Sequence, residues 1–239
     1  MQWTSAANTH MGNLRTRNED AVFCSSYRQL WAVADGMGGH NAGDYASEVI
    51  AQALTDVDLG NDLSDCVDAL EDALLEVNDH LRRHARMYCN GQTVGSTVVC
   101  LVARGDTGVA LWAGDSRLYR LRGRKLHQIT RDHNPISDLL DSGAVSEAEA
   151  LAAQTNIITR AIGGRSDLHL DVAVFDVQQG DTLLLCSDGL YRELDHQQLE
   201  CALRQDVESA AEALMRDCLR GKARDNISIV VTRAEAASG

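Results

Sequence analysis

The sequence has little proline, no low-complexity joint and no long apolar run. One Pro in 239 residues, with no Gly/Ser-rich stretch between segments, predicts a single domain that covers residues 1–239. No stretch approaches the roughly 18 apolar residues that a membrane span needs. The N-terminus lacks both the basic and the apolar region of a signal peptide. From these absences we expect a cytoplasmic protein that makes no contact with a membrane.

Basic residues and paired cysteine motifs are also scarce. The 22 Lys and Arg residues are outnumbered by 35 Asp and Glu, which gives a net charge of -13. Nonspecific nucleic-acid binding needs a basic surface that releases counterions, so the net charge argues against this class of function. The seven cysteines have no CxxC spacing, and several, such as Cys100 and Cys186, lie in apolar runs. These positions predict reduced thiols in the core, which fits the cytoplasm.

The pattern of apolar residues predicts an α+β fold with mainly antiparallel sheets. Helical spacing predicts helices over 42–55, 64–87, 195–203 and 206–220. Short apolar or alternating runs predict strands over 21–25, 30–34, 97–102, 108–113, 118–122, 125–130, 168–175, 182–186 and 227–232. An irregular excursion fills 134–156. Because the strands come in hairpin-linked groups between groups of helices, we expect antiparallel sheets covered by helices rather than a doubly wound parallel sheet.

Five aspartates stand in short motifs where a predicted strand or helix gives way to a turn. They are Asp20 in RNED, Asp35 in ADGMGG, Asp115 in AGDSR, Asp188 in SDG and Asp225 in DN. Any single Asp-Gly pair is best explained as an ordinary turn, but five such sites beside strong strand signals are different. Carboxylates at strand ends, with Gly opening access to a carbonyl such as that of Gly36, suit hard divalent cations. The pattern predicts a metal-dependent hydrolase.

Two divalent ions about 4 Å apart can bridge a water, lower its pKa and align it for attack on phosphorus. Such ions also remove the repulsion between gathered carboxylates. Hydrolysis of a phosphate further needs a cation near the nonbridging oxygens. Arg15, five residues before Asp20, is the best candidate, because a guanidinium binds two phosphate oxygens at once.

A set of motifs in fixed order resembles the metal-dependent serine/threonine protein phosphatases, the PPM or type 2C group, and in particular its bacterial branch. The motifs are Arg15…Asn18-Glu19-Asp20, Asp35-Gly-Met-Gly-Gly-His40…Gly43, Gly95-Ser-Thr97, Ala113-Gly-Asp-Ser-Arg117, Ile158-Thr-Arg-Ala-Ile-Gly163, Ser187-Asp-Gly189 and Asp225-Asn226. They cover the chain from about residue 8 to 233. The resemblance implies a four-layer αββα sandwich, two sheets flanked by helix pairs, with a flap over about 134–156.

The resemblance also implies a cofactor and roles for individual residues. It implies two central Mn²⁺ or Mg²⁺ ions and a third, weaker one. The central ions would be held by Asp20, Asp35, the Gly36 carbonyl, Asp188 and Asp225. Asp115 and Asp188 would help to hold the third ion. Arg15, Asp35 and Asp188 are the expected catalytic residues, and a hydroxide bridging the ions would attack phosphorus without a phosphoenzyme.

Two positions depart from the family pattern. Met37 follows the Asp-Gly pair where eukaryotic relatives have a His taken as the general acid, and His40 is either a proton donor or a surface residue. In the flap, Asn156 stands where some relatives offer a Ser to the third metal. The segment Arg131-Asp132-His133 resembles a catalytic motif in its residue types, but a turn or capping role is favoured because the segment leads from a strand into the flap.

The function predicted is removal of phosphate from phosphoserine or phosphothreonine by a monomer that opposes a Ser/Thr kinase. Its partners would be phosphorylated proteins and that cognate kinase. The Cys-x5-Arg spacing occurs at Cys186–Arg192 and at Cys218–Arg224, but these cysteines belong to the apolar run 182–186 and to the apolar stripe of the helix 206–220. Both are expected to be core thiols, which argues against a cysteine-based phosphatase. A non-catalytic phosphoprotein-binding module is the alternative from another class, but no metal-ligand Asp is missing. A closer alternative is a phosphatase dedicated to one anti-sigma antagonist or secretion-system protein.

Overall fold

Two antiparallel sheets form the centre of the computed structural model, which describes residues 1–38, 42–146 and 157–236. The first sheet has five strands in the order β1 (Gln2–His10), β11 (Ile227–Glu235), β10 (Thr182–Cys186), β7 (Arg117–Arg122) and β8 (Lys125–Gln128). The second follows the order β2 (Asp20–Ser25), β3 (Leu30–Gly38), β5 (Val98–Arg104), β6 (Thr107–Ala113) and β9 (Asp171–Asp176), and β4 (Val94–Ser96) pairs with β3. Every pairing between these strands is antiparallel.

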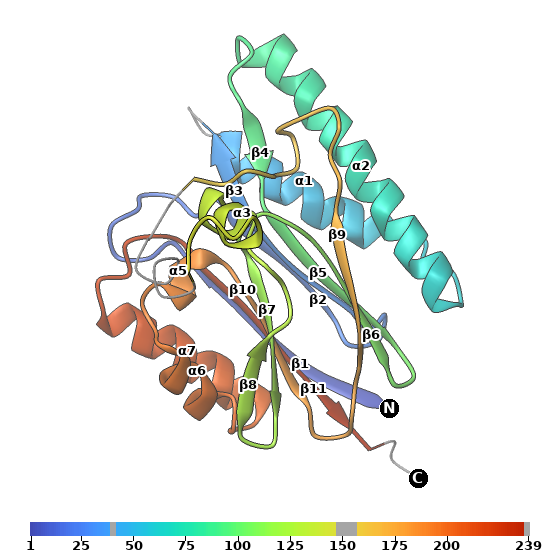
Figure 1. Ribbon diagram of the computed structural model, residues 1–239, viewed down its shortest axis with the longest axis vertical. Helices are drawn as coiled ribbons and strands as arrows, with labels where there is room; N and C mark the ends of the chain where they lie inside the picture. The colour runs from blue at the N-terminus through green and yellow to red at the C-terminus, as the bar shows by residue number, and fades with distance from the viewer. Residues whose placement is uncertain (39–41, 147–156, 237–239) are drawn as a thin grey trace.

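Helix pairs cover the two outer faces of the sheets, on opposite sides of the molecule (Figure 1). The helices are α1 (Ala42–Asp56), α2 (Leu63–Tyr88), α3 (Pro135–Asp141), α5 (Asp188–Tyr191), α6 (His196–Ala202) and α7 (Val207–Arg220). One buried cluster joins α1 and α2 to the second sheet, and another joins α6 and α7 to the first. A third lies between the sheets, where the Trp3 and Trp31 rings are 4.9 Å apart. The predicted α+β class and four-layer αββα arrangement are confirmed.

The long helices form where sequence periodicity and capping agree. The predicted stripe on α7 is buried along its length: Val207, Ala210, Ala211, Leu214 and Cys218. Full burial of Val207 and Leu214 contributes about 1.5–3 kcal/mol each, and the smaller side chains let the helix pack closely, so the stripe fixes the helix on its sheet. The Asp206 side chain accepts a hydrogen bond from the Ser209 N–H at 2.9 Å and begins α7.

Some elements differ from the sequence-based expectation. Strand β1 was not predicted, yet it pairs with β11 from Gln2 to His10. The strand predicted over 168–175 begins only at Asp171, although Leu168 and Leu170 are buried just before it. Within the excursion over 134–156, helix α3 is described, whereas 147–156 lie outside the described residues.

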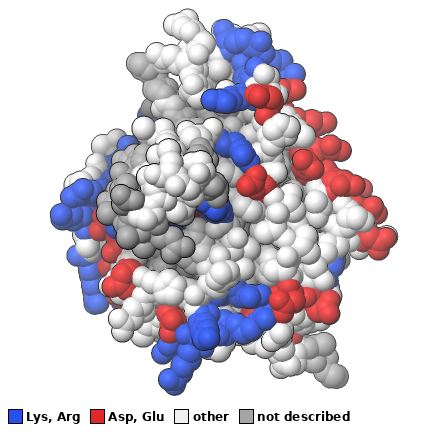
Figure 2. Space-filling model, viewed as in Figure 1, with Lys and Arg blue, Asp and Glu red and all other residues white. Residues whose placement is uncertain are grey.

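The surface carries the excess of acidic residues, and several of them follow α2. Asp65, Asp68, Asp72, Glu76 and Asp79 are all exposed, and Figure 2 shows acidic side chains along the edge where Figure 1 places this helix. Among the described helices, none combines the length and apolar character required to cross a bilayer. The core-thiol prediction is confirmed for Cys66, Cys100, Cys186 and Cys218 and is wrong for Cys24 and Cys201, which are exposed.

Candidate metal centre

Adjacent strands bring two of the five aspartates side by side. Asp20 begins β2, and it faces Asp35 on β3 in the antiparallel register. Directly opposed residues on neighbouring strands have Cβ atoms about 4.5–5.5 Å apart, so their carboxylates share one face of the sheet. Strand β3 does not stop at Asp35 as the sequence suggested, but runs on to Gly38.

The motif around Asp188 joins this pair from the other sheet. The Ser187 hydroxyl donates a hydrogen bond to Asp20 Oδ2 at 2.8 Å and accepts one from the Ser228 N–H at 2.9 Å. Ser187 therefore ties the end of β10, the start of β11 and Asp20 together. The next residue, Asp188, begins the one-turn helix α5.

Asn226 fixes the loop that precedes β11. Its side-chain oxygen accepts from the Glu19 N–H at 2.8 Å, and its amide nitrogen donates to the Met11 and Arg17 carbonyls at 3.0 and 2.8 Å. These bonds tie the segment before Asp20 to the loop that carries Asp225. Sequence reasoning gave Asn226 no role of its own, although its place beside Asp225 in a motif was the available signal.

Two glycines let the backbone segments approach closely. A Cβ added at Gly36 would lie 2.1 Å from the Gly43 carbonyl oxygen and 2.4 Å from that of Glu19. A Cβ at Gly189 would lie 2.0 Å from the carbonyl oxygen of Asn226. Both contacts are with backbone atoms that cannot swing away, so only glycine fits. The glycines of the Asp-Gly pairs at 35–36 and 188–189 are thus required by packing: Gly36 lies within strand β3 and Gly189 within helix α5, so no turn is formed at either pair.

Two arginines lie against the carboxylates. Arg15 donates to Asp225 Oδ2 at 2.8 Å, with 51% of the Arg15 side chain exposed. Arg192, which the sequence analysis did not single out, lies 3.0 Å from Asp188 Oδ2 and 3.3 Å from Asp115 Oδ2. The signal for Arg192 was its position four residues after Asp188, the spacing that places two side chains on one helical face.

Burial and mutual repulsion raise the pKa of several members of the carboxylate cluster, by which we mean Asp20, Asp35, Asp115, Asp188 and Asp225. Desolvation is the largest cause throughout. It raises the pKa of Asp20 to about 7 and that of Asp188 to about 6. The pKa of Asp35 rises well above its ordinary value, because the charges of Asp20 and Asp188 add to the effect of burial. Because these carboxylates are buried and repel one another, binding of a proton or a cation stabilises them.

The donor set fits hard divalent cations. Asp20 Oδ1 and Asp188 Oδ1 are buried and have no hydrogen-bond partner among the described residues. Carboxylate oxygens and a backbone carbonyl are the ligands that Mg²⁺ and Mn²⁺ prefer. In the described part of the chain no three acidic, His or Cys side chains yet converge at ligand spacing. Arg15 and Ser187 instead hold Asp225 and Asp20 by one oxygen each, so a cation would draw these two carboxylates off their partners. Arg192 contacts Asp188 through Oδ2, which leaves Oδ1 for a cation.

Other residues from the sequence analysis have structural partners. Thr97 supports the centre, because its hydroxyl accepts from the Asp35 N–H at 3.2 Å and its own N–H donates to the Asp35 carbonyl at 2.9 Å. Asp132 receives two hydrogen bonds from the Arg117 guanidinium, at 2.8 and 2.7 Å. His133 Nδ1 accepts from the Gly114 N–H at 3.0 Å, which agrees with the turn role favoured for this string.

Met37 is half-buried on β3. His40 and Asn156 lie outside the described residues.

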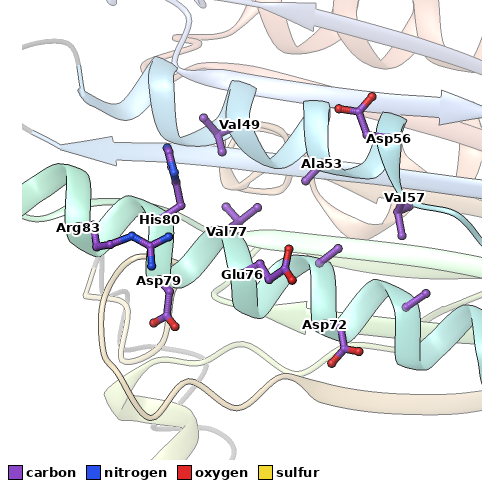
Figure 3. A pocket seen from close by; sticks show the side chains of 12 residues that line it. Val49, Ala53, Asp56, Val57, Asp72, Glu76, Val77, Asp79, His80 and Arg83 are labelled. Atoms are coloured by element: carbon purple, nitrogen blue, oxygen red, sulfur yellow. The ribbon is translucent and has the colours of Figure 1, made fainter.

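A cavity of about 750 Å³ lies elsewhere, in the groove between α1 and α2 (Figure 3). Val49, Ala53 and Val77 contribute apolar surface, and Asp72 and Glu76 are among the charged residues that line it. None of its lining residues belongs to the carboxylate cluster. The cavity therefore has no part in the candidate metal centre.

Comparison with known proteins identifies the family of the chain. The family model described as Protein phosphatase 2C matches residues 10–225. The chain belongs to the protein phosphatase 2C family, as its motifs predicted.

Individual relatives cover nearly the whole chain. The serine/threonine protein phosphatase PstP of Mycobacterium tuberculosis is 33% identical over 228 residues, which cover 95% of this chain and 44% of that protein. The chain thus spans less than half the length of this curated relative. The solved structure of "PppA, a key regulatory component of T6SS in Pseudomonas aeruginosa" has a TM-score of 0.89 at 41% identity, covering 98% of each chain.

A solved relative also bears on the predicted cofactor. The catalytic domain of the serine/threonine protein phosphatase PstP, in complex with two manganese ions, has a TM-score of 0.86 at 32% identity. It covers 98% of this chain and 99% of that one. Manganese bound in a close structural relative agrees with the predicted Mn²⁺ or Mg²⁺, and the oxygen-rich donor set described above suits either ion.

Proposed function

We propose that this chain is a metal-dependent protein phosphatase that hydrolyses phosphoserine and phosphothreonine. One observation carries the proposal: in a 2C-family chain, two buried carboxylates from distant motifs, Asp20 and Asp188, each keep an oxygen without a partner among the described residues, and Ser187 links the two motifs. Asp20, Asp35, the Gly36 carbonyl, Asp188 and Asp225 would hold two divalent cations. When bound, these cations supply an activated water nucleophile and neutralise charge on the phosphate.

The protein's own residues would orient the substrate. Arg15 is half exposed at the rim of the cluster, so its guanidinium can exchange Asp225 for the nonbridging oxygens of a phosphate. Ser187 and Thr97 hold Asp20 and Asp35 by hydrogen bonds. These fixed positions supply the preorganisation that in-line displacement needs. We assign Arg15, Asp35 and Asp188 as the catalytic residues.

The wider setting follows from this assignment. We propose that residues 1–239 form one catalytic domain that acts as a monomer in the cytoplasm. Its substrates would be proteins that a cognate Ser/Thr kinase has phosphorylated. The negative net charge of -13 supports the absence of nucleic-acid and anionic-membrane partners.

Release of phosphate from a phosphothreonine peptide tests the proposal. We expect activity with Mn²⁺, none in excess chelator, and recovery when Mn²⁺ is restored. Asp35→Asn and Asp188→Asn should each lower kcat/KM by at least about 100-fold, because each removes a charged metal ligand. Equal activity in chelator would refute the mechanism. Inactivity of folded, Mn²⁺-loaded protein on several phosphoproteins would favour a phosphoprotein-binding module.

A second candidate concerns the substrate rather than the chemistry. The likeness to PppA extends over 98% of both chains at 41% identity. We therefore also propose a dedicated role in regulating a secretion system, in which one phosphorylated component of that machinery is the substrate. Dephosphorylation rates on that component and on unrelated phosphoproteins separate the two. A preference of at least about 100-fold in kcat/KM supports a dedicated enzyme, and equal rates support a general kinase antagonist.

A further inference from the structure

Arg192 lies between two carboxylates that the family resemblance assigns to a third cation. One nitrogen, Nη2, is 3.0 Å from Asp188 Oδ2 and 3.3 Å from Asp115 Oδ2. Asp115 and Asp188 come from different parts of the chain, and this guanidinium is within ion-pair distance of both. A protein-borne positive charge thus stands between the two ligands.

The two carboxylates need such a charge. Their side chains are only 6% and 13% exposed, for Asp115 and Asp188 respectively. Two carboxylates in so little solvent repel each other strongly, and removing their cationic partner would leave buried charge uncompensated. Arg192 itself is 31% exposed, so its guanidinium is anchored at the edge rather than sealed inside.

Neighbouring contacts fix the segments that carry these residues. The Tyr191 hydroxyl donates to the Asp115 carbonyl oxygen at 2.9 Å. The Arg117 guanidinium lies 3.5 Å from the centre of the Tyr191 ring and is held from behind by its two bonds to Asp132. The Arg192 N–H donates to the Asp188 carbonyl at 3.1 Å. The turn after β6 and the end of α5 are therefore locked together with Arg192 between them.

We propose that Arg192 supplies the positive charge that a third divalent cation would supply between Asp115 and Asp188, so that the protein binds two divalent cations rather than three. A guanidinium stays charged at every physiological pH and does not dissociate. The charge at this position is therefore independent of the metal concentration. This inference rests on the proposed two-cation centre and differs from the sequence-based expectation of a third ion.

Counting bound Mn²⁺ tests the inference on the full chain. Free and bound Mn²⁺ are measured by electron paramagnetic resonance as the ion is titrated to saturation. We expect two ions per chain for the wild type and three for Arg192→Ala. Arg192→Lys keeps a cation and should bind two. Arg204→Ala is the matched control: it removes an arginine that pairs with a carboxylate four residues away, Glu200, and this variant should also bind two ions.

A second measurement reports the electrostatic role without turnover. In chelator, Arg192→Ala should melt at least several degrees below the wild type, whereas Arg192→Lys should recover most of the difference and saturating Mn²⁺ should restore Arg192→Ala. If Arg192→Ala does not fold by circular dichroism, Arg192→Gln is titrated in its place.

Three ions in the wild type, or two in the folded neutral variant, would overturn the inference. A wild type that binds no Mn²⁺ would instead refute the proposed function.

Discussion

Replacing Asp20 by Asn should stabilise the metal-free protein while it weakens the metal centre. Asp20 is only 8% exposed. Its Oδ2 accepts from the Ser187 hydroxyl at 2.8 Å, and an Asn side-chain oxygen can accept the same bond. Its Oδ1 is buried with no hydrogen-bond partner among the described residues. The substitution therefore keeps the shape and the hydrogen bond but removes a buried charge that repels Asp188 and Asp225.

The size of the effect follows from the raised pKa. Burial, with smaller contributions from Asp188 and Asp225, raises the pKa of Asp20 from 3.8 to about 7. Between pH 3.8 and about pH 7, Asp20 keeps a proton in the folded protein that it has released in the unfolded chain. Stability contributed by Asp20 is thus present below pH 4 and is lost as pH rises to 7. At about 1.4 kcal/mol per pKa unit the loss reaches at most about 4 kcal/mol.

Urea unfolding in chelator at pH 8 and at pH 4.5 measures this effect. Because the Asn amide must also be buried, we expect Asp20→Asn to gain about 1–3 kcal/mol at pH 8 and much less at pH 4.5. With Mn²⁺ at 100 times its dissociation constant, the unfolding free energy of the wild type should rise by about 2.7 kcal/mol and that of the variant by little. The stability advantage of the variant should therefore shrink or reverse. A variant less stable than wild type in chelator at pH 8, or equally stabilised by Mn²⁺, would refute this reasoning.

Three further substitutions test the parts that surround the carboxylates. Gly36→Ala should lower the unfolding free energy by at least about 2 kcal/mol in thermal melts, because its Cβ meets fixed backbone atoms; Gly91→Ala, in open space, should cost only about 1 kcal/mol for its left-handed backbone. Arg15→Ala should lower kcat/KM on a phosphopeptide by about 10- to 100-fold, mainly through KM, while Mn²⁺ stoichiometry stays unchanged; a lost ion would assign Arg15 to metal retention instead. Ser187→Ala leaves the Ser228 N–H and an Asp20 oxygen without their partner, so chemical denaturation should show a loss of about 1–3 kcal/mol; an unchanged midpoint would show that water replaces the hydroxyl.

Much of the fold could be predicted because apolar periodicity reports burial directly. Helices α1, α2 and α7 follow their stripes closely. Strand β1 was missed because its sequence, QWTSAANTH, alternates weakly and is mostly half-buried or exposed. It is held by its full-length pairing with β11, the partner strand at the other end of the chain, and no local pattern carries that information.

The residues of the candidate metal centre could be proposed from the sequence, but their contacts could not. Asp-Gly pairs after apolar runs indicated Asp35 and Asp188, and the order of motifs indicated the other aspartates. Spacing along the sequence could not show that Arg192 lies between Asp188 and Asp115, because Asp115 is brought there by tertiary packing. The same holds for Asn226, whose three hydrogen bonds join segments more than 200 residues apart.

The most direct test is diffraction at the manganese absorption edge from crystals of the full chain grown with Mn²⁺. Two anomalous peaks should lie within ligand distance of oxygen atoms from Asp20, Asp35, Gly36, Asp188 and Asp225. Peaks elsewhere on the surface, or no peak in crystals of protein that dephosphorylates a phosphothreonine peptide, would contradict the proposed metal centre.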